Sequence, residues 1–164
     1  LFSAHSIPTA MAASSRYEQE IVEASRLVGE RVDPTGTLQS EVVWQSRSGS
    51  PTVPWLEPDI TSRIRTLASE GVRAVAISPI GFPIENFEIV WDLDIEAAQA
   101  AKDSGVDFVR ARTVDDDPRF VSMIIDLISE RVHPEPRARS SLGKLGPTSD
   151  SCPSDCCPVA SGSQ

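Results

Sequence analysis

The residues best suited to chemistry lie in the segment GFPIENFEIVWDLDIE, residues 81–96. Glu88, Asp92 and Glu96 recur there every four residues, so on a helix they form one acidic stripe. Like charges four residues apart disfavour a helix by about 0.2–0.5 kcal/mol per pair. A stripe that accepts this cost either lies in solvent or faces a cation, and periodicity alone leaves both interpretations open.

A histidine near the start of the chain favours the interpretation that the acidic stripe faces a cation. His5 follows a short apolar run in LFSAHSIP, residues 1–8. Histidine changes its charge most readily around neutral pH, so this side chain can bind a metal or accept a proton. The alternative is a loop histidine that bonds only its own backbone.

The elements that would position these residues follow from the apolar pattern. Runs rich in Val, Ile and Phe predict strands over residues 1–5, 41–45, 72–78 and 107–111. Apolar residues spaced by three and four predict helices over 17–28, 60–68 and about 85–102, and a fourth that begins with Asp117 as N-cap and Pro118. Val90, Leu93 and Ala97 should turn inward. Four βα units in succession predict an α/β fold with a four-stranded parallel sheet flanked by helices.

Ligands of parallel α/β sheets gather at the carboxyl ends of the strands. His5 follows the first predicted strand, residues 47–55 follow the second, and residues 81–88 follow the third. We therefore expect all three segments at one edge of the domain. Trp55 and Phe82 would add flat apolar walls there, although such aromatic residues are also common in cores. Gly81 would let the backbone approach a planar ligand.

The composition of the chain excludes some classes of binding partner. The net charge of −9 argues against nucleic acid and anionic membrane surfaces. No apolar run reaches the ~18 residues of a membrane span, so we expect a cytoplasmic protein. Residues 1–132 form the α/β domain, and residues 133–164 form an irregular tail rich in Pro, Ser and Gly that contains all three cysteines.

Several motifs in order resemble one family. FSAHSIP and PIGF…ENFEIVWDLDIEA, with WQSRSGSPTVPWLEPD between them, are similar to the C-terminal half of a ferrochelatase, from residue 1 to about 132. Within that family, the chain resembles the bacterial enzymes of actinobacterial type. The resemblance implies a Rossmann-like chelatase half whose N-terminal half is missing. It also implies a lyase of heme biosynthesis that inserts Fe²⁺ into coproporphyrin III or protoporphyrin IX.

The resemblance also implies roles for individual residues. His5 and Glu88 would be catalytic and would contact the incoming metal, with Asp92 and Glu96 extending the metal site outward. Trp55 and Phe82 would line the porphyrin pocket. In the same pocket, Arg47 would pair with a propionate of the porphyrin, unless it is a solvated arginine at a strand end. Asn86 departs from the animal members of the family, which have histidine there.

The cysteines Cys152, Cys156 and Cys157 lie in the tail. The resemblance implies that they hold a [2Fe–2S] cluster whose fourth ligand lies in the missing N-terminal half. A zinc site and unligated thiols are the alternatives, since clustered cysteines in a cytosolic protein suggest metal before disulfide.

Two other functions compete with this interpretation. One is a cobalt or nickel chelatase for sirohydrochlorin, against which the WQSR and PWLEP segments argue. The other is a non-catalytic iron–sulfur or ligand-binding module on a flavodoxin-like fold. No glycine-rich phosphate loop follows any predicted strand, which argues against nucleotide binding.

Overall fold

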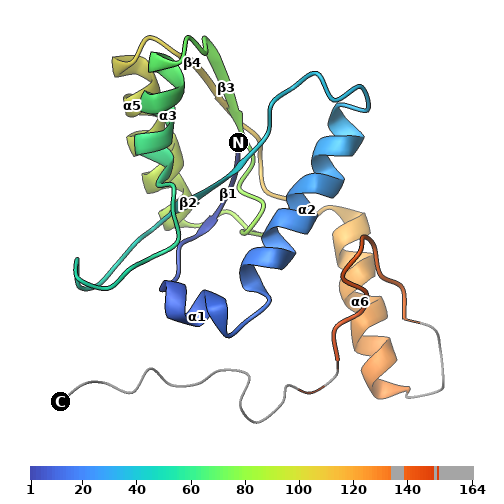
Figure 1. The fold of residues 1–164 in the computed structure, drawn as a ribbon. Helices are drawn as coiled ribbons and strands as arrows, with labels where there is room; N and C mark the ends of the chain where they lie inside the picture. Colours follow the sequence, from blue (N-terminus) through green and yellow to red (C-terminus); the bar gives the residue numbers. More distant parts are fainter. Residues whose placement is uncertain (134–138, 150, 152–164) are drawn as a thin grey trace.

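The computed structural model describes residues 1–133, 139–149 and 151 (Figure 1). Its strands are β1 (Phe2–His5), β2 (Val42–Gln45), β3 (Ala74–Ile77) and β4 (Asp107–Arg110). All four predicted strands are present, with ends that differ by at most two residues. The α/β class with parallel strands is therefore confirmed.

The strands pair as two parallel two-stranded sheets, β1 with β2 and β3 with β4. One parallel bridge between Phe2 and Ser78 joins the two pairs. At this junction the Ser3 N–H donates to the Ser78 carbonyl at 2.8 Å, and the Ser78 N–H donates to the Leu1 carbonyl at 2.9 Å. Pro79 follows directly and has no N–H to continue the ladder. The single four-stranded sheet that the sequence predicts is therefore seen as two linked pairs.

Helices flank the strands on both sides (Figure 1). Their bounds are α1 (Thr9–Ala13), α2 (Tyr17–Val32), α3 (Ile60–Ser69), α4 (Phe87–Ile89), η1 (Val90–Ala97), α5 (Ala98–Asp103) and α6 (Pro118–Val132). The predicted helices at α2, α3 and α6 are confirmed, and α1 was not predicted. Asp117 caps α6 as expected, because its side chain accepts the Arg119 N–H at 2.9 Å.

The third predicted helix is not a uniform α-helix, because η1 is a π-helical segment between α4 and α5. Ile89 at the end of α4 and Leu93 and Ala97 of η1 are buried, whereas Val90, the first residue of η1, is 40% exposed. The inward position predicted for Val90 is therefore wrong, and Ile89 takes that place. The buried residues recur every four positions, a longer period than the 3.6 residues of an α-helix, which fits the wider π-helical turn.

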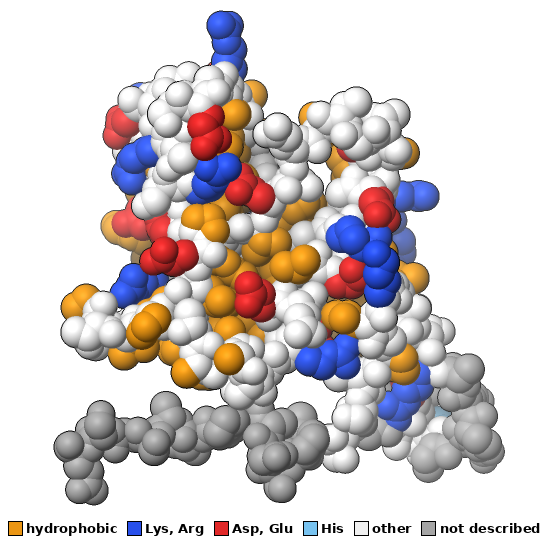
Figure 2. All heavy atoms as spheres, in the orientation of Figure 1, with side chains coloured by type: hydrophobic (Ala, Val, Ile, Leu, Met, Phe, Trp, Pro, Cys, Tyr) orange, Lys and Arg blue, Asp and Glu red, His pale blue; other side chains and the backbone are white. Residues whose placement is uncertain are grey.

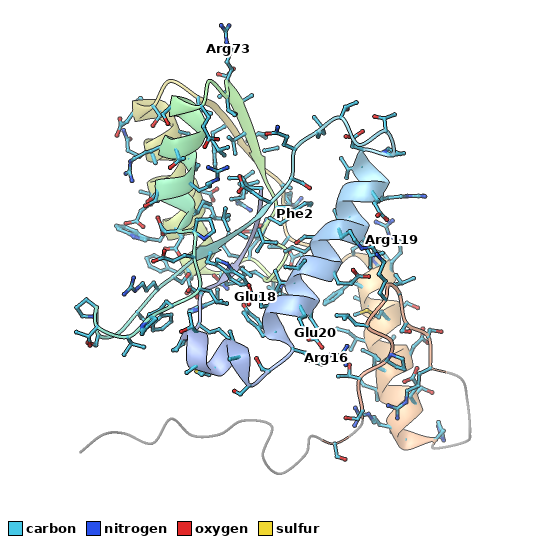
Figure 3. The ribbon with its side chains drawn as sticks, viewed as in Figure 1. Phe2, Arg16, Glu18, Glu20, Arg73 and Arg119 are labelled. Carbon is cyan, nitrogen blue, oxygen red and sulfur yellow. The ribbon has the colours of Figure 1, made fainter. Side chains whose placement is uncertain are left out.

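The core lies between the strands and the layer formed by α3, η1 and α5. Ile60, Ile64 and Leu67 of α3 pack there with Leu93 and Ala97 of η1. On the other face, the Phe2 side chain lies between the sheet and α2 (Figure 3), where its ring approaches Gly29. The two helical layers thereby hold the strand ends in a fixed position.

Part of the tail contacts α2. The Lys144 N–H donates to Glu23 of α2 at 2.7 Å. The guanidinium of Arg16, labelled in Figure 3 just before the start of α2, donates to the Leu145 carbonyl at 3.0 Å. Hydrogen bonds from Arg26 and from the Lys144 amide lower the pKa of Glu23 to about 2. These contacts tie the described tail residues to the domain.

Candidate functional site

His5 and Glu88 meet at the carboxyl ends of the strands. The His5 Nε2 atom lies 3.1 Å from Glu88 Oε1, and the two side chains are 39% and 40% exposed. His5 is the last residue of β1, and Glu88 lies in the first turn of α4, after the segment that follows β3. The structure thus brings together two residues that are 83 positions apart in the sequence.

The backbone around His5 is held from three directions. The Tyr17 hydroxyl donates to the His5 carbonyl at 2.8 Å, and the Ser6 N–H donates to the Gln45 carbonyl at 2.8 Å. Gly81 packs against β1, where an added Cβ would lie 2.5 Å from the Ala4 Cβ. Gly81 is therefore needed for close packing of its loop on β1, rather than for the approach of a ligand that the sequence suggested.

Asn86 sets the position of Glu88. Its side chain accepts the Ile89 N–H at 2.9 Å and so caps the start of α4. Glu88 follows two residues later, at the positive end of this short helix. Asn86 accordingly has a structural role here, as an N-cap that aims Glu88 at His5.

The hydrogen bonds of the imidazole define what the pair can do. His5 Nδ1 lies 2.5 Å from the Ser6 carbonyl oxygen, which can only accept, so Nδ1 is the protonated nitrogen of the neutral ring. The Nε2 lone pair then faces the Glu88 carboxylate, and the pair needs a proton or a cation between them. A divalent metal about 2.1 Å from each atom would hold the two about 3 Å apart as neighbouring ligands.

The remaining acidic residues of the stripe have other surroundings. Asp92 accepts hydrogen bonds from the Ser46 hydroxyl and from Gln45 Nε2, the latter at 3.2 Å. Glu96 is exposed. In the described ranges, no three His, Cys, Asp or Glu side chains come together as a metal site. Of the four predicted metal-contacting residues, the structure therefore brings only His5 and Glu88 into contact.

The aromatic residues divide between core and surface. Phe82 is 9% exposed and belongs to the core, as does Trp44 at 3%. Trp55 and Arg47 line a groove of about 590 Å³ formed by residues 47 and 51–57 with Thr9. Arg47 donates to the Pro51 carbonyl at 3.2 Å and to the Val53 carbonyl at 3.4 Å. Trp55 Nε1 is buried and has no hydrogen-bond partner within the part of the chain that the structure describes.

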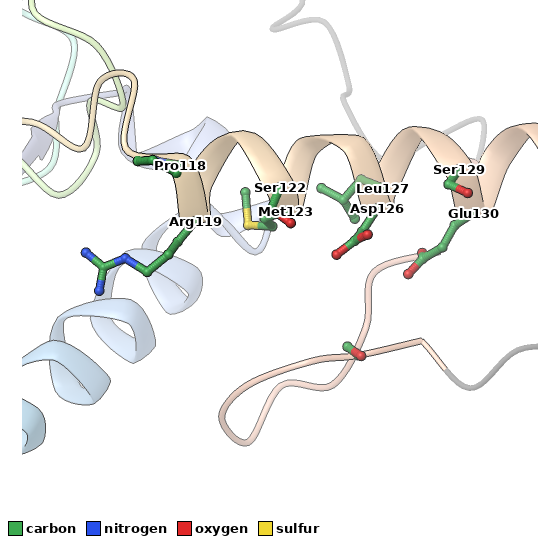
Figure 4. A pocket seen from close by; sticks show the side chains of 9 residues that line it. Pro118, Arg119, Ser122, Met123, Asp126, Leu127, Ser129 and Glu130 are labelled. Atoms are coloured by element: carbon green, nitrogen blue, oxygen red, sulfur yellow. The ribbon is translucent and has the colours of Figure 1, made fainter.

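A second hollow, of about 630 Å³, lies along α6 (Figure 4). Arg119, Ser122 and Asp126 line it together with Ser140 of the tail. Among the described residues, no predicted site residue lines it, and neither His5 nor Glu88 does.

Sequence reasoning missed several residues that contact the acidic segment, residues 81–96, among them Gln45, Ser46 and Arg110. Gln45 ends β2 and is 1% exposed, and Ser46 follows it with a φ of 61°. Arg110 ends β4 and pairs with Glu85 and Asp94. Their places directly at strand ends are the signal that could have identified them.

The three cysteines lie outside the described residues. In the described part, no helix is long and apolar enough to span a membrane.

Known proteins resemble this chain along most of its length. The model of the family described as Ferrochelatase matches residues 1–132. The coproporphyrin III ferrochelatase of Streptomyces griseus is 42% identical over 173 residues, which cover 96% of this chain and 46% of that protein. The ferrochelatase of Rhodopirellula baltica is 41% identical over 170 residues, which cover 99% of this chain and 47% of that protein. The coproporphyrin III ferrochelatase of Mycolicibacterium smegmatis is 44% identical over 144 residues, which cover 85% of this chain and 41% of that protein.

A solved structure supports the fold. The putative cobalamin biosynthesis CbiX protein of Marinobacter aquaeolei superposes with a TM-score of 0.52 at 15% identity, covering 82% of this chain and 96% of that one. The likeness concerns the fold alone. Our chain spans about half the length of the curated relatives that it matches. With the family's motifs at the strand ends and its model matched from residue 1 to 132, the chain belongs to the ferrochelatase family.

Proposed function

We propose that this chain is the C-terminal half of a longer ferrochelatase, which inserts Fe²⁺ into a porphyrin in heme biosynthesis. The single observation that carries the proposal is the contact of His5 with Glu88 at the strand ends of a family member. Coproporphyrin III is the favoured substrate, because relatives at 42–44% identity are named for it. The test is metal insertion by the full-length gene product.

Two protons must leave the pyrrole nitrogens when the metal enters. His5 Nε2 accepts one, since its lone pair is free when Nδ1 donates to Ser6, and the other leaves to solvent along the outward route of Asp92 and Glu96. Glu88 stabilises the imidazolium that results, 3.1 Å away. Asp92 and Glu96 extend the site outward as a route for metal or protons, because hard carboxylate oxygens hold Fe²⁺ weakly enough to release it.

The groove beside Trp55 is the proposed place for one edge of the porphyrin. It lies on the loop that follows β2, and the loop after His5 pairs with it through Pro8 and Trp55. Arg47 would bind a propionate by exchanging its backbone carbonyl partners for a carboxylate. The buried position of Phe82 favours a supporting role behind the pocket wall.

The exposed apolar side of α6 supports the proposal that a second domain packs against this one. Val121, Ile124, Ile125, Ile128 and Val132 are 40–64% exposed, and α6 has no buried residue among those described. Such a face normally covers a core. Since more than half of each relative lies outside the aligned segment, we propose that the N-terminal half of the longer protein covers this face. In this proposal, residues 1–132 are one domain and residues 133–164 its tail.

Ile128→Gln in the full-length protein should therefore lower the free energy of unfolding by about 1–2 kcal/mol, because a buried isoleucine contributes on this scale. Ser122→Gln, about 100° round α6 from this apolar side, is the matched control and should change it by less than about 0.5 kcal/mol. Urea denaturation of both variants measures the difference. Equal stability of the two variants would argue against a covered α6 face.

We further propose that Cys152, Cys156 and Cys157 supply three ligands to a [2Fe–2S] cluster and that the N-terminal half supplies the fourth. The donor chemistry supports this, because thiolates are the ligands that such clusters require. Replacing any one of the three by serine should remove the visible absorption and the EPR signal of the reduced cluster from the full-length protein. An unchanged spectrum in all three variants would refute the assignment.

The competing functions lack a specific observation in their favour. The likeness to the CbiX protein is a likeness of fold, and it carries no evidence for cobalt or nickel. We place the protein in the cytoplasm, with porphyrin and ferrous iron as its substrates.

A further inference from the structure

Arg110 ends β4 and holds two carboxylates of the acidic segment at once. Its Nε and Nη2 atoms donate to the two oxygens of Asp94 at 2.6 and 2.9 Å, and Nη1 donates to Glu85 at 2.8 Å. The Arg110 side chain is only 16% exposed. A planar guanidinium is suited to this task, because its donors form a rigid fork that matches carboxylate oxygens.

Glu85 is held by more than Arg110. The Thr113 N–H and hydroxyl donate to the same Glu85 oxygen at 3.2 and 3.3 Å. The hydrogen bond from Arg110 is the largest cause that lowers the pKa of Glu85, and the Thr113 amide adds to it. Glu85 is thus an ionised anchor whose Oε1 atom accepts from both Arg110 and Thr113.

The acidic segment reaches three different strands through three side chains. Glu88 contacts His5 at the end of β1, and Asp94 contacts Arg110 at the end of β4. Between them, Asp92 binds Gln45 at the end of β2. Glu88 lies three residues after one partner of Arg110 and six residues before the other. Arg110 therefore fixes the chain on both sides of the residue that faces His5.

The same contacts neutralise some of the negative charges of the acidic segment. It contains five carboxylates: Glu85, Glu88, Asp92, Asp94 and Glu96. Arg110 pairs with Glu85 and Asp94 and so offsets two of these five negative charges. Without Arg110, the free carboxylates would repel Glu88 and offer a cation other places to bind.

We propose that Arg110 is a positioning residue for metal insertion: by holding Glu85 and Asp94 it fixes Glu88 against His5. This inference rests on the proposed function, because the reaction it concerns is that of the His5–Glu88 pair. Arg110 acts through Glu88 and does not itself contact the substrates.

A matched control exists on α3. Arg63 also binds two carboxylates, Glu41 at 2.8 and 2.9 Å and Glu70 at 3.2 Å, with its side chain 22% exposed. In the full-length protein, Arg110→Gln and Arg63→Gln should lower the melting temperature by similar amounts. Only Arg110→Gln should lower kcat, by about 10-fold or more, because small misplacements of a reacting group have effects of this size. The KM for porphyrin should stay the same.

Arg110→Lys should recover only part of the lost kcat, since one ammonium cannot bind two carboxylates as a fork does. A kcat for Arg110→Gln within about twofold of that for Arg63→Gln would overturn the inference. Full rescue by lysine would show that charge alone suffices and would also overturn it.

Hydrogen exchange gives a readout that does not depend on activity. Amides of residues 86–97 should exchange faster in Arg110→Gln than in Arg63→Gln, because the clamp on this segment is lost. Equal exchange in the two variants would contradict the inference. A wild-type protein that inserts no metal would refute the proposed function instead, and hydrogen exchange would then still decide whether Arg110 holds this segment.

Discussion

Replacing His5 by alanine in the complete enzyme is expected to lower kcat for metal insertion by about 100-fold or more, while porphyrin still binds. General acid–base groups contribute about 10²–10⁴-fold to rates, and His5 is the basic group of the proposed site. Its Nε2 lone pair faces Glu88, and its backbone is held by Tyr17 through a bond that alanine keeps. The measurement is steady-state insertion of Zn²⁺ or Fe²⁺, with porphyrin binding followed separately by fluorescence.

His133 is the matched control, because it is the other histidine of the sequence and lies at the exposed end of α6. His133→Ala should leave kcat within about twofold of the wild type. If His5→Ala retains half of the wild-type kcat, His5 has only a structural role and the proton acceptor is another group.

Glu88→Gln should be the most damaging change in the acidic segment, again by about 100-fold in kcat. The amide keeps the size of the side chain and removes the charge that stabilises an imidazolium or holds a cation 3.1 Å away. Glu96→Gln is the control on the same segment, exposed to solvent. It should mainly raise the KM for iron.

Asp92→Asn should also affect KM more than kcat, because an asparagine oxygen can still accept from Ser46 and Gln45. Steady-state titrations of iron for all three variants separate kcat from KM. Equal losses of kcat in the three variants would show that the stripe acts as one unit, against this ranking.

The sequence alone was enough to predict the four strands and the contact between His5 and Glu88. The contact follows from one rule, that parallel strands place their carboxyl ends at one edge of the sheet. The residues of these ends are local in sequence, so the pattern of apolar runs determines them. The likeness of fold to a solved structure and the family match agree with this part of the prediction.

The sequence was not sufficient for features that depend on packing. The strict four-residue recurrence of Ile89, Leu93 and Ala97 was a signal for the π-helical segment, but it lies close to the α-helical period. Phe82 was expected in a pocket wall, and only tertiary packing shows that it fills the core. The Arg110 contacts join residues at separations of 16 and 25 positions, which no local pattern specifies.

Electrostatic contacts also have a pH dependence that the sequence alone does not give. Glu85 has a pKa below its ordinary value in the folded protein, because Arg110 and Thr113 donate to it. A lowered folded-state pKa contributes stability above the unfolded pKa, which is lost as pH falls through the folded value. The Arg110 clamp should therefore persist at neutral pH and weaken only in acid.

Metal insertion by the full-length gene product tests the central claim most directly. The protein is incubated anaerobically with Fe²⁺, or with Zn²⁺ as a stable substitute, and with either coproporphyrin III or protoporphyrin IX. Metal insertion is measured as the loss of fluorescence or absorption of the free porphyrin. Our account predicts catalytic turnover with at least one porphyrin, faster with coproporphyrin III. His5→Ala and Glu88→Gln should each lower this turnover by about 100-fold or more. Absence of turnover with both porphyrins, or turnover that survives both substitutions, would contradict it.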